Sequence, residues 1–572
     1  MISMKDQSIL VDTRTLTAEI NQGFLTSLLD KKNGRAWLGP FDPVGGSALQ
    51  LVYGGGEVVG FDAAKSARIV PRLLSDHQAE VRFHGWDADG VISIRECPQT
   101  GALLIEPSAY SSRRGVLACR WNLRGLADDL ELVAPLFQGV RLRLDDELLR
   151  DSRWPWPFQW EAGLAVLQGQ GGGFWVHTRD TRYRHKALKV GRPGEVGCLG
   201  FDTEANGPLE GSLGTGGLCW RVNVFEGDWQ GPAREYRDWL WQAYDLRRRQ
   251  EQRRPWVGDI RLAIGWCNGE PELLEALASR LAPGRVLIHF SNWRTDGYDE
   301  NYPDYTASEA GRAFMAKAAD MGFHVMPHCN AIDMDPTHPV YEQVRDFQYR
   351  DPLGKARQGW AWDTERHVSL RVPNSNVALL ENRRRKVMVK IHPGLSMWRS
   401  ILAQNIQTGL DQLPVDAVFI DVTLCTWNLL NCLVEELTCT EGMKRLVDQV
   451  ADIATGTAGR AGLVVGGEGL NEIIMQGLSI GQVHLFNSSG PSVKGLERTG
   501  GCALNALLFE GLARTFGYSA LAGRNQDEIT RSEIHLSHGA IPTITSPAAQ
   551  DILNPNAHVR RLLEIAADGG RS

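Results

Sequence analysis

The sequence lacks the features that mark several classes of protein. Its ten cysteines include no Cys-x-x-Cys pair, so neither a zinc knuckle nor a disulfide framework is expected. No stretch approaches the ~18 uninterrupted apolar residues that cross a membrane, and the N-terminus has no apolar core of a secretory signal. The net charge is −7 without a clustered basic face, which argues against nucleic acid as a partner. We therefore expect a cytoplasmic globular protein.

The pattern of short apolar runs divides the chain into two parts. Residues 1–228 carry many short runs separated by Gly, Asp and Pro, which is typical of a β-sandwich. Residues 229–256 have helical spacing, with Pro232 suited to the first turn, and we assign them to a linker helix. From residue 257 to about 550, strand-like and helix-like segments alternate, which predicts parallel strands joined by helices.

Seven or eight such units in about 290 residues fit a (β/α)8 barrel better than an open sheet. We predict strands at 259–266, 285–292, 323–330, 417–422, 462–467 and 482–487, with weaker candidates at 518–521 and 540–545. A helix is predicted over 503–516. Residues 331–394 form a long insertion after the third strand, expected as a subdomain over the pocket, and residues 551–572 form a tail. No Gly-x-Gly-x-x-Gly follows the first strand, so a dinucleotide site is not supported and no cofactor is expected.

Polar residues follow five consecutive predicted strands. In (β/α)8 barrels the catalytic residues lie at the carboxyl ends of the strands. Polar residues at the ends of five consecutive strands are hard to assign to chance. The most informative residues are Asp421, which follows four apolar residues, and Glu468, which follows two glycines. Each also has a structural interpretation: Asp421 as a hydrogen-bonded carboxylate at a strand end, and Glu468 as a partner of a helix dipole. Together they supply the two carboxylates that hydrolysis of a glycosidic bond requires.

Further candidates are side chains suited to binding sugar hydroxyls or a sugar ring. At a strand end, the polar atoms of a histidine or an asparagine are at least as often hydrogen-bonded within the fold as bound to a ligand. Most tryptophans are simply buried in the core. The predicted substrate-binding residues are Trp293, Asp296, Asp304, His328, Asn330, His392, His484 and Asn487.

The motifs resemble those of retaining glycoside hydrolases. The similarity is to the endo-α-N-acetylgalactosaminidase-like group and its little-characterised relatives, which join an N-terminal β-supersandwich to a catalytic (β/α)8 barrel. The segments that carry it are Gly227-Asp-Trp, Tyr236-Arg-Asp-Trp239, Gly297-Tyr-Asp-Glu-Asn-Tyr-Pro-Asp304-Tyr, Val418-Phe-Ile-Asp421 and Gly466-Gly-Glu468. The resemblance implies that Asp421 is the nucleophile and Glu468 the general acid/base, and it favours an α-linked substrate.

A double displacement places the two carboxyl groups about 5–5.5 Å apart, whereas inversion needs about 6.5–9.5 Å. It also calls for a raised pKa at Glu468 and an ionised Asp421. We expect exo action on a small glycoside. Two alternatives stay open: a metal-dependent barrel hydrolase or isomerase with His328, Asp421, Glu468 and His484 as ligands, and a non-catalytic carbohydrate-binding protein. Nothing in the sequence marks an oligomer interface.

Overall fold

The computed structural model of the chain divides into two compact units. It describes residues 1–39, 41, 46–61, 68–191, 197–350, 352, 359–362, 367–368, 386–411, 413–453, 463–486, 495–499 and 501–569. Unit 1 comprises Met1–Trp239 with Trp427–Cys432, and unit 2 comprises Leu240–Thr426 with Leu433–Ser572. Among the described residues, no helix is long and apolar enough to cross a membrane.

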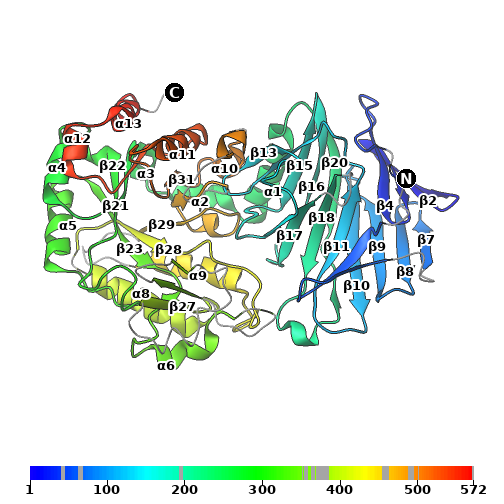
Figure 1. Cartoon of the computed structure of the whole chain (residues 1–572), viewed down its shortest axis with the longest axis horizontal. Coiled ribbons are helices and arrows are strands. Elements are labelled where there is room, and N and C mark those ends of the chain that lie inside the picture. The colour runs from blue at the N-terminus through cyan, green and yellow to red at the C-terminus, as the bar shows by residue number, and fades with distance from the viewer. Residues whose placement is uncertain are drawn as a thin grey trace. The chain divides into compact units, whose positions relative to one another are not determined.

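Unit 1 is built from antiparallel sheets, because its short strands alternate buried and exposed residues between tight turns. One sheet holds β1 (Ile2–Lys5), β2 (Ser8–Asp12), β3 (Leu16–Asn21) and β4 (Phe24–Asp30). The largest has the order β13 (Val140–Arg143), β12 (Glu131–Ala134), β15 (Leu164–Gly169), β16 (Gly172–His177), β20 (Trp220–Glu226), β10 (Leu103–Ser111), β9 (Ala88–Glu96), β8 (Gln78–His84), β7 (Arg68–Ser75), and β19 (Gly214–Thr215) pairs with β10. Strands β7 to β10 lie side by side in Figure 1.

A third sheet of unit 1 contains its most buried charged network. Its order is β14 (Ser152–Pro155), β17 (Lys186–Gly191), β18 (Cys198–Glu204), β11 (Val116–Arg124), β5 (Leu49–Tyr53), β6 (Val58–Gly60). The fully buried Asp202 on β18 accepts hydrogen bonds from Arg120 and Arg153. At the end of the same strand, Asn428 donates to the Glu204 carboxylate (3.0 Å) and the Ala205 carbonyl (2.7 Å), which ties the segment Trp427–Cys432 into unit 1.

Unit 2 contains eight parallel strands, and the predicted barrel is confirmed. The sheet runs β31 (Arg514–Gly517), β30 (Ile480–Val483), β29 (Val464–Glu468), β28 (Ala417–Asp421), β23 (His324–Asn330), β22 (Val286–Phe290), β21 (Leu262–Cys267), β32 (Thr543–Thr545). A parallel bridge between Phe516 and Ile541 joins its two ends and closes the barrel. The nearly continuous burial of these strands follows from their apolar sequences, as expected for parallel strands covered by helices.

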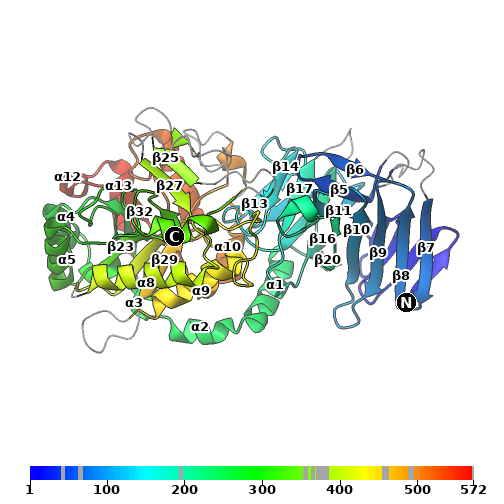
Figure 2. The ribbon, with the colours of Figure 1, turned by 90° about the horizontal axis from the view of Figure 1, so that it is seen from below.

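Helices cover the outside of these strands. The main ones, α4 (Pro271–Ala278), α5 (Glu309–Met321), α8 (Ser396–Leu410) and α9 (Cys439–Ala451), lie outside the strands in Figures 1 and 2. Helix α5 begins at the cap Ser308, whose hydroxyl accepts from the Gly311 amide, and α9 begins with a capping box of Thr438 and Glu441. The others are α1 (Gln230–Ala243), α2 (Leu246–Gln252), α3 (Trp256–Asp259), α6 (Tyr341–Val344), α10 (Leu504–Phe509), α11 (Gln526–Ser537), α12 (Ala549–Leu553) and α13 (Ala557–Ala567).

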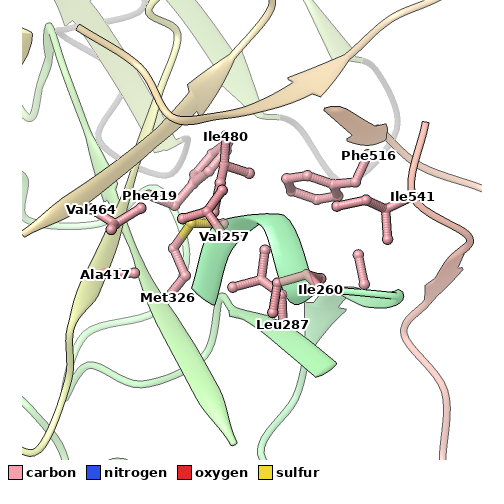
Figure 3. Close-up of a cluster of buried hydrophobic side chains, with 11 residues drawn as sticks. Val257, Ile260, Leu287, Met326, Ala417, Phe419, Val464, Ile480, Phe516 and Ile541 are labelled. Carbon is pink, nitrogen blue, oxygen red and sulfur yellow. The ribbon is translucent and has the colours of Figure 1, made fainter. Parts of the chain in front are cut away.

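The lower core of the barrel forms around the short helix α3. Val257 on α3 and the following Ile260 are fully buried among strand residues, as Figure 3 shows. The surrounding side chains come from seven strands and from the residue two before the eighth, β32: Ala263, Leu287, Met326, Ala417, Phe419, Val464, Ile480, Phe516 and Ile541. This cluster fills the barrel interior at the amino ends of the strands. Polar side chains can therefore gather at the carboxyl ends without a channel running through the barrel.

Two details differ from the sequence prediction, and a third adds to it. The seventh strand lies at Arg514–Gly517 rather than 518–521, because α10 stops before Gly511, which adopts a left-handed backbone (φ +85°). Residues 551–572, expected as a tail, include α13, which buries Val559 and Leu562. The insertion after the third strand contains an antiparallel sheet in the order β24 (Asp333–Met334), β27 (Lys386–Lys390), β25 (Gly359–Trp362), β26 (His367–Val368).

Candidate active site

Asp421 and Glu468 lie at the carboxyl ends of neighbouring strands. β28 and β29 pair in parallel with Ile420 opposite Gly467, so the two acidic residues follow at the next step of the same register. The amide of Val422 donates to Glu468 Oε2 (3.1 Å), which links the end of one strand to the carboxylate of the other. The side chains are largely buried, with Asp421 3% and Glu468 7% exposed. The structure therefore brings the predicted carboxylates together.

The two oxygens of Asp421 have different surroundings. Oδ2 accepts a long hydrogen bond from the Tyr298 hydroxyl (3.4 Å) and lies 3.7 Å from His328 Nε2. Oδ1 is buried and has no hydrogen-bond partner among the described residues. A buried carboxylate oxygen without a donor is costly in a folded protein. Such an atom is a candidate for a reacting group, since the fold itself does not use it.

Both oxygens of Glu468 are occupied. Oε2 accepts from the Val422 amide, and Oε1 lies 2.8 Å from Nε2 of His484. Because a backbone amide can only donate, a proton on Glu468 has its place at Oε1, where His484 Nε2 can accept it or return it. His484 is half-buried and stacks on Tyr518 at 4.0 Å between ring centroids. The contact thus gives the second carboxylate a route for gaining and losing a proton.

The site concentrates negative charge in a buried place. Burial raises the pKa of Asp421 well above its usual range, and the neighbouring Glu468, Asp299 and Asp333 raise it further. We expected Asp421 to remain ionised, so this resting arrangement differs from the prediction. Burial is the main cause, Glu468 on β29, Asp333 on β24 and Asp299 in the loop after β22 add to it, and no Lys or Arg contacts Asp421 among the described residues.

Half-buried aromatic rings surround Asp421. Trp266 at the end of β21 lies edge-on to Tyr298 (5.7 Å between centroids) and to Tyr518 (5.8 Å), and it is 5.5 Å from His328. The Trp266 indole donates to the Tyr518 carbonyl (2.8 Å), which fixes the ring. Apolar rings of this kind pack well on the face of a pyranose.

Other predicted residues are used by the fold. Trp293 is fully buried and its indole donates to the His328 carbonyl, so its polar atom is used by the fold and its role as a sugar platform stays a prediction. Asn330 is fully buried and bonds Asp333 and the Ile332 amide, and the buried His392 accepts from the Gly394 amide. Their polar atoms close turns after strands, which is the structural alternative for each of them.

Two predicted carboxylates hold the loop after β22. Asp304 accepts from the amide and hydroxyl of Thr306, and Asp296 accepts from Asn301. Neither contacts Asp421 or Glu468 in any described interaction. Asn487 lies outside the described residues. Of the eight predicted substrate-binding residues, His328 and His484 are thus the two placed beside the acids.

Six residues of the site were not predicted from the sequence, and one of them, Trp266, ends the first predicted strand. Tyr298 and Asp299 belong to the loop that carried the family resemblance, but they were not singled out. Tyr518 was hidden by the misplaced seventh strand. His289 and Lys390 sit in apolar runs, Val286-Leu-Ile-His289-Phe and Val387-Met-Val-Lys390-Ile, where one polar residue among apolar ones was the available signal. Among the described residues, no three His, Cys, Asp or Glu side chains are grouped to hold a metal ion.

Comparison with known proteins extends the picture at the level of the fold. Residues 219–436 match the model of a family described as a domain of unknown function (DUF6259), and no curated protein matches the chain. Solved structures of the alpha-N-acetylgalactosaminidase NagBb from Bifidobacterium bifidum are similar over 100% of this chain and 93% of theirs. The ligand-free form has a TM-score of 0.67 at 14% identity, and the GalNAc complex 0.66 at 13%. The predicted fold, a β-sandwich followed by a (β/α)8 barrel, is therefore confirmed.

Proposed function

We propose that the protein is a retaining glycoside hydrolase that removes a terminal α-linked sugar from a small glycoside. The observation that carries the proposal is the pair Asp421 and Glu468 at adjacent strand ends, joined by the Val422 amide. The fold similarity to NagBb, an alpha-N-acetylgalactosaminidase, supports an α-linked substrate and makes N-acetylgalactosamine the first sugar to test.

In the first step, Asp421 Oδ1 attacks the anomeric carbon while Glu468 gives its proton to the departing glycosidic oxygen. The bond to the leaving group breaks as the bond to Asp421 forms. Oδ2 stays with the Tyr298 hydroxyl, which orients the carboxylate so that Oδ1 faces the substrate. In the second step, Glu468 takes a proton from water, the water oxygen bonds to the anomeric carbon, and the Asp421–sugar bond breaks.

A retaining glycosidase begins with one protonated and one ionised carboxyl group, and a pair that holds one proton meets that condition. Because burial raises the pKa of Asp421, substrate binding has to favour its ionised form before Oδ1 can attack. The excess of carboxylates also favours the positive charge that develops on the sugar in the transition state.

Activity is tested with aryl α- and β-glycosides of N-acetylgalactosamine, galactose and glucose. The Asp421→Asn and Glu468→Gln variants are compared with Asp416→Asn, a control at the opposite end of the same strand, where Asp416 pairs with His324. We expect Asp421→Asn to lose at least about a thousandfold in kcat/KM, roughly 4 kcal/mol, and Asp416→Asn to stay near wild type. Equal rates in all three variants contradict the site.

The roles of the two acids are separated by rescue with azide. For an α-glycoside, Asp421→Ala with azide should yield the β-glycosyl azide, because azide attacks from the vacated side. Glu468→Ala with azide should yield the α-glycosyl azide through the covalent intermediate. Products exchanged between the variants mean that the roles are reversed. Proton NMR of the first-formed sugar anomer in wild type distinguishes retention from inversion.

A further inference from the structure

His289 is a buried polar residue for which packing gives no reason. It occupies the fourth position of the apolar strand β22 and is fully buried. Its ring lies against Phe419 (4.3 Å between centroids) and 6.1 Å from Phe516 inside the barrel. An apolar residue of similar size would satisfy this environment, so the imidazole invites a chemical explanation.

The ring nitrogens of His289 take part in a directed chain. The Trp266 amide donates to His289 Nδ1 (3.3 Å), and His289 Nε2 lies 3.0 Å from His328 Nδ1. The far nitrogen of His328, Nε2, lies 3.7 Å from Asp421 Oδ2. The chain therefore runs from a backbone amide through two imidazoles to the proposed nucleophile.

The donor at its start fixes the direction of this chain. An amide N–H only donates, so His289 Nδ1 carries a lone pair and the single proton of a neutral imidazole sits on Nε2. That proton is donated to His328 Nδ1, which leaves the proton of His328 on Nε2, facing Asp421. Both rings are neutral, because burial lowers the pKa of His289 to about 3 and that of His328 well below its usual value.

The backbone at Trp266 is bent in a way that serves this contact. Trp266 has a left-handed backbone (φ +55°), and the pairing of β21 with β22 shifts register between Ile264 and Cys267. A bulky residue in this conformation is an outlier that the surrounding structure must impose. The bulge turns the Trp266 amide out of the regular strand ladder and onto His289.

We propose that His289 is a positioning residue that holds His328 as the Nε2–H tautomer, so that Asp421 Oδ2 faces a donor. In the opposite tautomer a lone pair faces the carboxylate and disfavours its ionised form. The donor also retains Oδ2, leaving Oδ1 for the attack, and the 3.7 Å separation shortens to a hydrogen bond when Asp421 ionises. This inference rests on the proposed function for its consequence in catalysis, but the tautomer itself is a property of the free protein.

The tautomer is measured by NMR on protein labelled with 15N-histidine, with His328→Asn used to assign the signals. Wild type should show a protonated Nε2 and an unprotonated Nδ1 at both His289 and His328. The His289→Phe variant, which has no donor for His328, should shift the ring signals of His328 toward the other tautomer. His289→Gln keeps an amide that can donate, and it should preserve the wild-type pattern.

Kinetics on a cleaved glycoside provide the second readout. His289→Phe should lower kcat by roughly tenfold to a hundredfold with little change in KM, and His289→Gln should recover most of the rate. An unprotonated Nε2 of His328 in wild type, or His328 signals unmoved in folded His289→Phe, overturns the inference. If no glycoside is cleaved while the tautomers are as expected, the proposed function fails and the positioning chain stands.

Discussion

Replacing Lys390 with an uncharged residue should destabilise unit 2 more than the loss of an exposed lysine does. Lys390 ends β27, and its Nζ lies 2.6 Å from Asp333 Oδ1, with both side chains 0% exposed. Asp333 Oδ2 accepts from Asn330 (2.9 Å). Lys390→Met leaves a buried carboxylate whose remaining side-chain donor is neutral. Breaking such a pair costs about 3–5 kcal/mol, on the order of 5 °C in the melting transition of a unit this large.

The assay is calorimetry, which separates the transitions of two units, with Lys317→Met as the matched control. Lys317 pairs with Glu275 at 2.8 Å, but the side chains are 37% and 68% exposed, so its loss should cost less than about 1 kcal/mol. Because burial already raises the pKa of Asp333, this residue can escape by protonation. A group with a raised folded pKa favours folding at low pH, so the deficit of Lys390→Met should be smaller at pH 5 than at pH 8. Equal losses in the two methionine variants refute the reasoning.

Two further predictions concern stability. Burial lowers the pKa of His185, His289 and His535 to about 3, so their contribution is complete above pH 6.5 and is lost as the pH falls toward 3. At pH 5 each should cost about 2 kcal/mol, and a melting temperature that does not fall on acidification contradicts this. Asn428→Ala removes hydrogen bonds to Glu204, to the Ala205 carbonyl and from the Gly207 amide. It should lower the stability of unit 1 by about 2–3 kcal/mol, measured by calorimetry, and an unchanged transition counts against it.

The fold and the acidic pair were accessible from the sequence because both follow from local rules. Alternating apolar runs and helical periods specify parallel strands, and a residue such as Asp421 directly after a buried strand reaches the functional end of a barrel. The predicted position of the seventh strand was wrong because two signals in the sequence competed. The apolar helical pattern continues past residue 509, whereas Gly511 ends the helix. The helical period alone predicts that the helix continues, but the left-handed backbone of Gly511 sets the point where the helix ends.

The binding residues were less accessible, because residue type does not reveal which hydrogen bonds a side chain finds in its own loop. Asn330, His392 and Asp304 are polar residues at strand ends, as predicted, but nearby backbone amides or carboxylates satisfy them. His289 shows the reverse case. Inside an apolar strand it has the sequence signature of a satisfied core histidine, and its partners, Trp266 and His328, come from two other strands.

Two bulky residues of the candidate site, Val422 and Trp266, have a strained left-handed backbone, and the amide of each donates to a side chain of the site. Val422 (φ +56°) donates to Glu468, and Trp266 (φ +55°) donates to His289. A β-branched and an aromatic residue are poor choices for left-handed backbone, where folding alone would favour glycine. The bulky side chains give a reason to keep them, since Val422 is buried and Trp266 packs on the neighbouring rings. Both amides are thereby held in place before substrate arrives, which is the arrangement that electrostatic preorganisation of a buried acid pair requires.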